Sequence, residues 1–153
     1  MGIRMTTKLS EVHDMLMREA ERVERLTIRA LSKLGEQCVT KIRDRAGDKS
    51  WYDQTGNLRS SVGYVIAHNK NIIQYSSFNQ VKQGSEGVKT GKDLAKELAK
   101  RYSNNYVLIV VAGMNYAEFV EAMDNKDVIA STELWVKEQV PLMLEKLKKQ
   151  IAK

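Results

Sequence analysis

The sequence has few of the residues on which most catalytic sites, metal sites and covalent frameworks depend. Its 153 residues include one cysteine, Cys38, and two histidines, His13 and His68. A single cysteine excludes an intrachain disulfide, and neither histidine has another histidine or a cysteine at the spacing of a zinc site. We therefore expect no disulfide framework and no metal, in a protein suited to a reducing compartment.

Long apolar runs are also missing. The longest, YVLIVVAGM at residues 106–114, is too short to span a bilayer, and the first residues become charged before any signal-like apolar stretch develops. Charged residues make up 29% and hydrophobic residues 42% of the chain, which is typical of a globular protein. The length predicts a single domain, residues 1–153. A net charge of +6 permits contact with nucleic acid or acidic protein surfaces without requiring either.

Candidate catalytic motifs do not hold up when their spacing is tested. The stretch GSEGVKTGKD resembles a phosphate-binding loop, but Glu86 stands where that loop needs glycine and Asp93 where it needs serine or threonine. Cys38 falls on an apolar helical stripe and is interpreted as a core residue. The pair Glu118 and Glu121 is a common arrangement on an exposed helix face. The sequence therefore predicts neither catalysis nor a cofactor.

Two long segments have helical periodicity. Between residues 8 and 46, apolar side chains recur at spacings of three, four and seven, which predicts one long amphipathic helix. Such a helix would be about 58 Å long, so we expect part of it to project or to break, with Gly35 as the weakest point. The last helix is predicted over residues 131–152, kinked at Pro141.

The middle of the chain predicts strands. Residues 62–78 indicate a hairpin turning at Asn69 and Lys70, and residues 106–112, apolar on both faces, indicate the central strand. Residues 80–92 carry three glycines and no apolar periodicity, which predicts a flexible basic loop, followed by a short helix at residues 93–102. The expected fold is α+β, with the N-terminal and C-terminal helices packed on one face of a small, mainly antiparallel sheet.

Lysines of the predicted loop and short helix are candidates to face DNA or a protein partner: Lys82, Lys89, Lys92 and Lys96. Lysine clusters can neutralise phosphates, yet aromatic residues are not interleaved with these, and no helix-turn-helix or ribonucleoprotein motif is present. A solvated surface explains the lysines equally well.

Two short segments resemble a known family. DQTGNLRSS (residues 53–61) has a threonine-glycine turn, then leucine, arginine and serine before a strand, and GMNYAEFVEA (residues 113–122) follows a strand with glycine and a tyrosine-alanine segment. Both resemble hallmarks of the tail-completion (neck) proteins of long-tailed double-stranded DNA bacteriophages, and the order of helices and strands agrees along nearly the whole chain. The matching residues are Thr55, Gly56, Leu58, Arg59, Tyr116, Ala117, Glu118 and Glu121.

The chain departs from the family pattern after Glu121, where Ala122 and Met123 replace a glycine-threonine pair and DNKDVIAS replaces a proline-rich stretch. The station within the virion therefore stays open among tail-completion, tail-terminator and head-closure components. Physically, we expect Thr55 and Gly56 to fix a turn, Leu58 to anchor it, and Arg59 to point outward for the carboxylate of Glu118 or Glu121.

The resemblance implies a structural virion component at the head-tail joint, assembled in the bacterial host cytoplasm. It would act without cofactor, catalysis or membrane, through a ring of its own copies and contacts with neighbouring neck or tail proteins. Non-specific DNA contact in the bore is a further expectation. The acidic residues of the segment 111–135 would face the basic loop and C-terminus of the next copy; they are Glu118, Glu121, Asp124, Asp127 and Glu133. The alternative is a basic DNA-binding accessory protein of a phage or mobile element.

Overall fold

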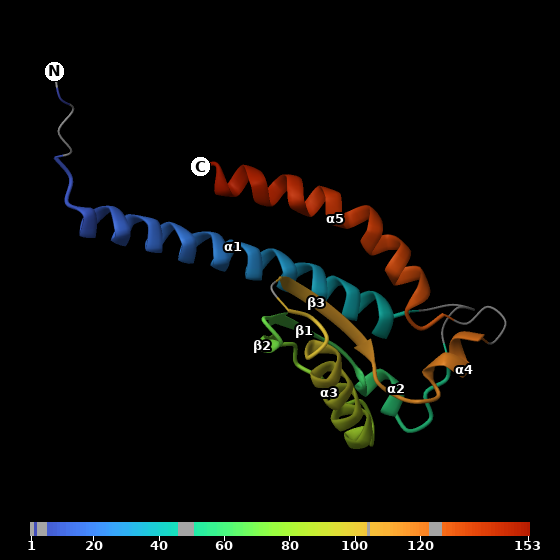
Figure 1. Ribbon diagram of the computed structural model, residues 1–153. Coiled ribbons are helices and arrows are strands. Elements are labelled where there is room, and N and C mark those ends of the chain that lie inside the picture. Colours follow the sequence, from blue (N-terminus) through green and yellow to red (C-terminus); the bar gives the residue numbers. More distant parts are fainter. Residues whose placement is uncertain (1, 3–5, 46–50, 104, 123–126) are drawn as a thin grey trace.

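The computed structural model describes residues 2, 6–45, 51–103, 105–122 and 127–153, with the backbone alone at residues 119 and 121. Helices and strands follow one another as α1 (Leu9–Arg43), α2 (Asn57–Ser60), β1 (Val62–His68), β2 (Asn71–Tyr75), α3 (Ser85–Ala99), β3 (Tyr106–Ala112), α4 (Ala117–Ala122) and α5 (Ala130–Ile151). This arrangement confirms the α+β class, with a long N-terminal helix, a C-terminal helix and a small antiparallel sheet (Figure 1).

The sheet has the strand order β2-β1-β3, and both pairings are antiparallel. The central strand is therefore β1, in which every residue but His68 is buried. The prediction that residues 106–112 form the central strand is wrong, because β3 lies at an edge. Its side chains are apolar on both faces because helices cover both faces of the sheet, not because it has two neighbouring strands.

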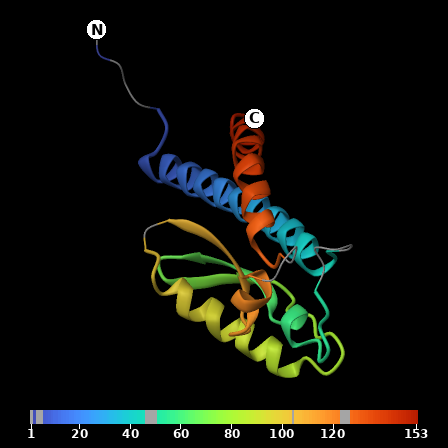
Figure 2. The same cartoon turned by 90° about the vertical axis from the view of Figure 1, so that its right-hand side faces the viewer.

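Helices cover the two faces as separate layers. On one face, α1 packs on a cluster that includes Ile42, Tyr64 and Ile66, and α1 lies between the sheet and α5 (Figures 1 and 2). On the opposite face, α3 packs on Val65 and neighbouring strand residues. The two long helices thus share one side of the sheet, with α3 on the other.

Gly35 does not break α1, which runs without interruption for 35 residues. A Cβ at this position would come within 2.7 Å of the Tyr64 ring. The glycine is therefore explained by close packing of the helix on β1 rather than by a weak point in the helix.

The prediction of a flexible loop at residues 80–92 is also wrong, because α3 begins at Ser85. The short helix expected at residues 93–102 is the second half of α3, which ends at Ala99. The fully buried residues of α3 are small and spaced four apart, namely Gly87, Gly91, Ala95 and Ala99, and buried Gly84 stands just before the helix. A Cβ on Gly87 would collide with the backbone oxygen of Asn57, and one on Gly91 with that of Ser61. The glycines let the helix backbone approach its neighbours closely, which offsets their low helix propensity.

The hairpin turn is confirmed at Asn69 and Lys70, whose φ angles of 50° and 67° are both positive. Positive φ at both central residues matches the twist of the flanking strands. The second strand ends at Tyr75, short of the predicted residue 78.

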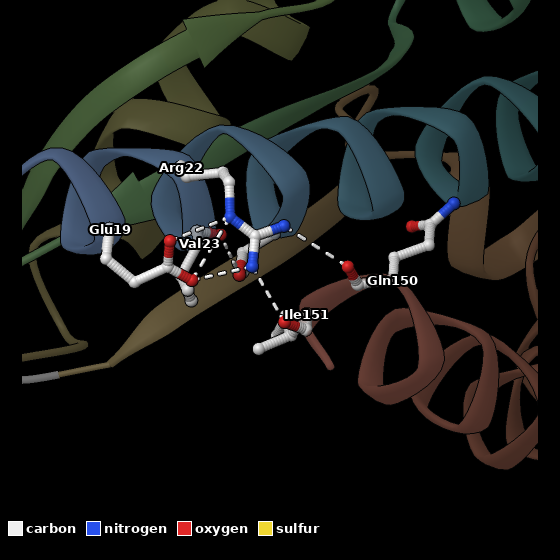
Figure 3. Close-up of polar contacts among 6 residues, drawn as sticks. Glu19, Arg22, Val23, Gln150 and Ile151 are labelled. Atoms are coloured by element: carbon white, nitrogen blue, oxygen red, sulfur yellow. Dashed lines mark hydrogen bonds and ion pairs between the residues drawn. The ribbon is translucent and has the colours of Figure 1, made fainter. Parts of the chain in front are cut away.

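The C-terminal helix, α5, contains Pro141 and bends along its length (Figure 1). A proline inside a helix removes one backbone hydrogen bond and favours such a bend. The far end of α5 is tied to α1 by Arg22, whose guanidinium donates to the carbonyl oxygens of Gln150 at 3.2 Å and Ile151 at 2.7 Å, and pairs with Glu19 (Figure 3). Arg22 thereby supplies donors to carbonyl groups that have no partner within the helix.

Candidate functional site

Residues 53–61 form a compact junction between the end of α1 and the start of β1. Gly56 adopts the left-handed conformation with φ of 82°, and a Cβ there would collide with the backbone oxygen of Val81. Leu58 is 1% exposed and belongs to the core cluster that also contains Ile42 and Trp51. Gly56 therefore makes the turn and Leu58 anchors it.

Asp53 is the residue of this junction that sequence reasoning missed. Its buried carboxylate accepts hydrogen bonds from the backbone N–H of Gly56 at 3.0 Å and of Arg59 at 2.7 Å. Both donors lie at the start of α2, where N–H groups lack helical partners and favour a negative charge. The Thr55 hydroxyl oxygen accepts a longer hydrogen bond from the Asn57 N–H, at 3.3 Å. The sequence signal that could have identified Asp53 is an aspartate three residues before a turn glycine.

The same junction also holds the start of α3. The side-chain oxygen of Asn57 accepts a hydrogen bond from the Gly87 N–H at 3.1 Å, and Ser60 Oγ accepts one from the Val81 N–H at 2.7 Å. Lys82, predicted to face DNA or a partner, donates to the carbonyl oxygen of Asp53 at 2.7 Å. Residues 81–87 are therefore bound to residues 53–60.

Arg59 does not point outward, which corrects the sequence prediction. Its partly buried guanidinium donates to the carbonyl oxygens of Arg43 at 3.2 Å and Trp51 at 3.3 Å, and lies 4.9 Å from the centroid of the Trp51 ring. A planar cation can satisfy two carbonyls and stack on an indole at the same time. Glu118, one of its two expected partners, is exposed, and the side chain of Glu121 lies outside the described part of the structure.

The second family-like segment meets the first at this end of the sheet. Burial, together with the nearby Asp53 carboxylate, raises the pKa of Tyr116, and the neighbouring Thr55 side chain partly offsets this shift. The Gly113 N–H donates to the Ser61 carbonyl at 3.3 Å. Tyr116 and Ala117 also pack on the core cluster. The structure therefore brings Thr55, Gly56 and Leu58 close to Tyr116 and Ala117.

The acidic segment expected to face a neighbouring copy is partly used within the chain. Asp127 pairs with Arg45 at 2.6 Å, with side chains only 12% and 11% exposed, and Arg45 also bonds the hydroxyls of Ser131 and Thr132. Burial of this pair fastens the start of α5 to the end of α1. The prediction that Asp127 faces another copy is therefore wrong. Asp124 lies outside the described residues.

The remaining lysine candidates, Lys89, Lys92 and Lys96, lie exposed on the outer side of α3. Acidic residues alternate with them, and Lys96 Nζ lies 3.9 Å from the Asp93 carboxylate. This surface of α3 is therefore of mixed charge.

Side chains that could in principle bind a ligand or react have structural roles here. Burial raises the pKa of the Cys38 thiol to about 11, and the ring of His68 stacks on Tyr106 at 4.1 Å. A cavity of about 500 Å³ is lined in part by Arg43 and Arg59, which already donate to backbone carbonyls. Within the described ranges, no three histidine, cysteine, aspartate or glutamate side chains gather as a metal site would require.

A second surface lies on the projecting segment, defined here as residues 9–21 of α1. Figure 1 shows this part of the helix extending beyond the sheet. Leu9, Met15 and Leu16 are 76%, 65% and 66% exposed. None of the helices described, this one included, is long and apolar enough to cross a membrane. The projecting segment thus presents apolar side chains that this chain leaves uncovered.

The chain matches no family model, no curated protein and no solved structure.

Proposed function

We propose that this protein is a structural virion component at the phage head-tail joint, a neck or tail-completion protein that assembles into a ring without catalysis. One observation carries the proposal. The two segments that resemble family motifs, far apart in sequence, meet at one end of the sheet, where the Gly113 N–H donates to the Ser61 carbonyl and Tyr116 packs on the core cluster that contains Leu58. A shared role in one structural junction gives a physical reason for both motifs to occur together in one chain.

The surface of the molecule also supports an assembly role. Exposed apolar side chains are concentrated on the projecting segment and on α5, where Leu134 and Leu142 are each 64% exposed. Apolar surface on protruding helices is typical of proteins that associate with others. Copies of itself and neighbouring neck or tail proteins are the partners that this role requires.

Deletion of the gene from the phage or prophage that encodes it tests the proposal. Lysates should contain filled heads and separate tails under the electron microscope, and wild-type protein supplied from a plasmid should restore joined particles. Mass spectrometry of purified virions should detect the chain. Infectious particles of normal yield and shape after deletion would overturn the virion role.

The DNA-binding alternative rests on the exposed row Lys89, Lys92 and Lys96. Acidic residues alternate with these lysines, which favours only weak contact with DNA. The proposed role requires no more than weak contact that is independent of base sequence. Affinity for duplex DNA, measured over a range of salt concentrations, separates the two functions. Tight, sequence-dependent binding that is lost in the triple Lys→Ala variant would favour the accessory protein.

A further inference from the structure

The projecting segment combines exposed apolar side chains with free negative charge. Leu9, Val12 and Leu16 follow a helical spacing of three and four, as the anchors of a helix that docks in a groove do. Glu11 and Asp14 form no ion pair with any residue in the described part of the chain. Four carboxylates and one arginine make the segment acidic: Glu11, Asp14, Glu19, Glu21 and Arg18.

A groove of complementary character lies between α1 and α5. It has a volume of about 360 Å³ and is lined by apolar residues of both helices, among them Leu26, Leu34, Leu142 and Leu147. Three cations also line it, namely Arg29, Lys33 and Lys146, and none of its lining residues is acidic. Among the described residues, none of these three cations takes part in an ion pair.

The segment cannot fill the groove of its own chain. The segment and the α1 wall of the groove belong to the same continuous helix of 35 residues, and the midpoints of residues 9–21 and 26–37 lie about 25 Å apart at 1.5 Å per residue. An occupant of the groove must therefore come from another molecule. The unpaired acids of the segment match the unpaired cations of the groove, and each side offers apolar surface.

We propose that the projecting segment of one copy docks in the α1/α5 groove of a second copy of this chain. Segment and groove are different parts of the surface, so each copy can donate one and receive another, and such head-to-tail contacts generate a ring when the rotation between copies closes. As an account of the ring, this inference rests on the proposed function, but the contact itself is testable on the purified chain alone.

Charge reversal on either side tests the contact. One variant carries Glu11→Lys and Asp14→Lys, and the other carries Arg29→Glu and Lys33→Glu. Sedimentation velocity of the intact chain should show association that either double substitution weakens about tenfold or more. An equimolar mixture of the two variants should associate again, because each reversed segment then meets a reversed groove.

A matched control reverses two charges elsewhere, Lys92→Glu and Lys96→Glu on α3, and should associate as the wild type does. Thermal unfolding of each variant checks that it is folded. A second test of the same contact does not rely on charge. A Leu16→Cys chain is mixed with a Leu142→Cys chain under mild oxidation. Because Cys38 is buried, the expected disulfide joins the two different chains.

The inference would be overturned by a wild-type chain that stays monomeric at about 1 mM. Association that neither charge reversal weakens would overturn it, and so would reversed variants that fail to associate when mixed. Docking of the segment on a neighbouring neck protein, with no contact between copies, would overturn it as well. A monomeric chain whose gene deletion still separates heads from tails would refute this contact and leave the proposed function standing.

Discussion

At the scale of single residues, Asp53 decides whether the junction holds its shape. Asp53→Ala leaves the N–H groups of Gly56 and Arg59 without their acceptor in a buried place. We expect the free energy of unfolding to fall by about 2 kcal/mol, the usual cost of losing a helix cap with unsatisfied donors. Urea unfolding measures this loss. Gln54→Ala, at an exposed neighbouring position, is the control and should change the value by less than about 0.5 kcal/mol. Equal effects of the two substitutions would contradict the role given to Asp53.

Cys38 should make stability depend on alkaline pH. Burial raises the pKa of its thiol from 9.0 to about 11, so the folded protein keeps the proton over a range in which the unfolded chain releases it. The contribution of this thiol to the free energy of unfolding is fully present below pH 9. It is lost as pH rises through 11, which lowers the free energy of unfolding by about 1–3 kcal/mol. Denaturant unfolding between pH 8 and pH 11 should show a steeper loss in the wild type than in Cys38→Ala. Parallel losses in both proteins would show that Cys38 does not contribute.

At this scale, the sequence predicted part of the junction. Gly56 and Leu58 could be assigned because a turn glycine and an apolar anchor have local signatures. Arg59 could not, since its partners include the carbonyl groups of Arg43 and Trp51, which only the tertiary fold brings near. Asp53 has a local signature, but a capping aspartate is common in turns and gains its importance here from burial.

At the scale of elements, periodicity predicted α1, the hairpin and α5 because each has a clear apolar side or a turn of defined type. It failed for the first half of α3, whose fully buried residues are the glycines Gly87 and Gly91. Small residues carry no hydrophobic period, and glycine is a signal for loops as well as for close packing. It failed for β3 because a strand covered on both faces has the same composition whether it lies in the middle or at the edge of a sheet.

The small residues of α3 give a prediction opposite in sign to helix propensity. Gly→Ala in an exposed helix interior stabilises by about 1 kcal/mol. Gly87→Ala should instead destabilise by about 2 kcal/mol or more, because the added methyl group would collide with the backbone of α2. Urea unfolding, with exposed Lys89→Ala as the control on the same helix, checks this expectation. A more stable Gly87→Ala variant would show that α3 does not pack closely on α2.

At the scale of the whole molecule, the fold separates into a packed body and a projecting helix. The sheet, α3 and the C-terminal half of α1 share the two core clusters, whereas every side chain from residue 13 to residue 21 is exposed. Stability and assembly therefore depend on different parts of α1. Substitutions in the body should act mainly on folding, and those in the projecting segment mainly on association.

A chain that begins at Glu19 tests this separation. It keeps the Glu19–Arg22 pair and the hydrogen bonds that hold the end of α5, and it loses only side chains that contribute little burial. We expect its free energy of unfolding to differ from that of the full chain by less than about 1 kcal/mol. A shorter truncation at the other end, which removes residues 142–153 and with them buried Leu147, should cost several times more. Urea unfolding measures both, and sedimentation at the same concentrations should show association in the full chain and none in the chain that begins at Glu19. Equal destabilisation by the two truncations would mean that the projecting segment belongs to the folded body, and unchanged association would place the contact between copies elsewhere.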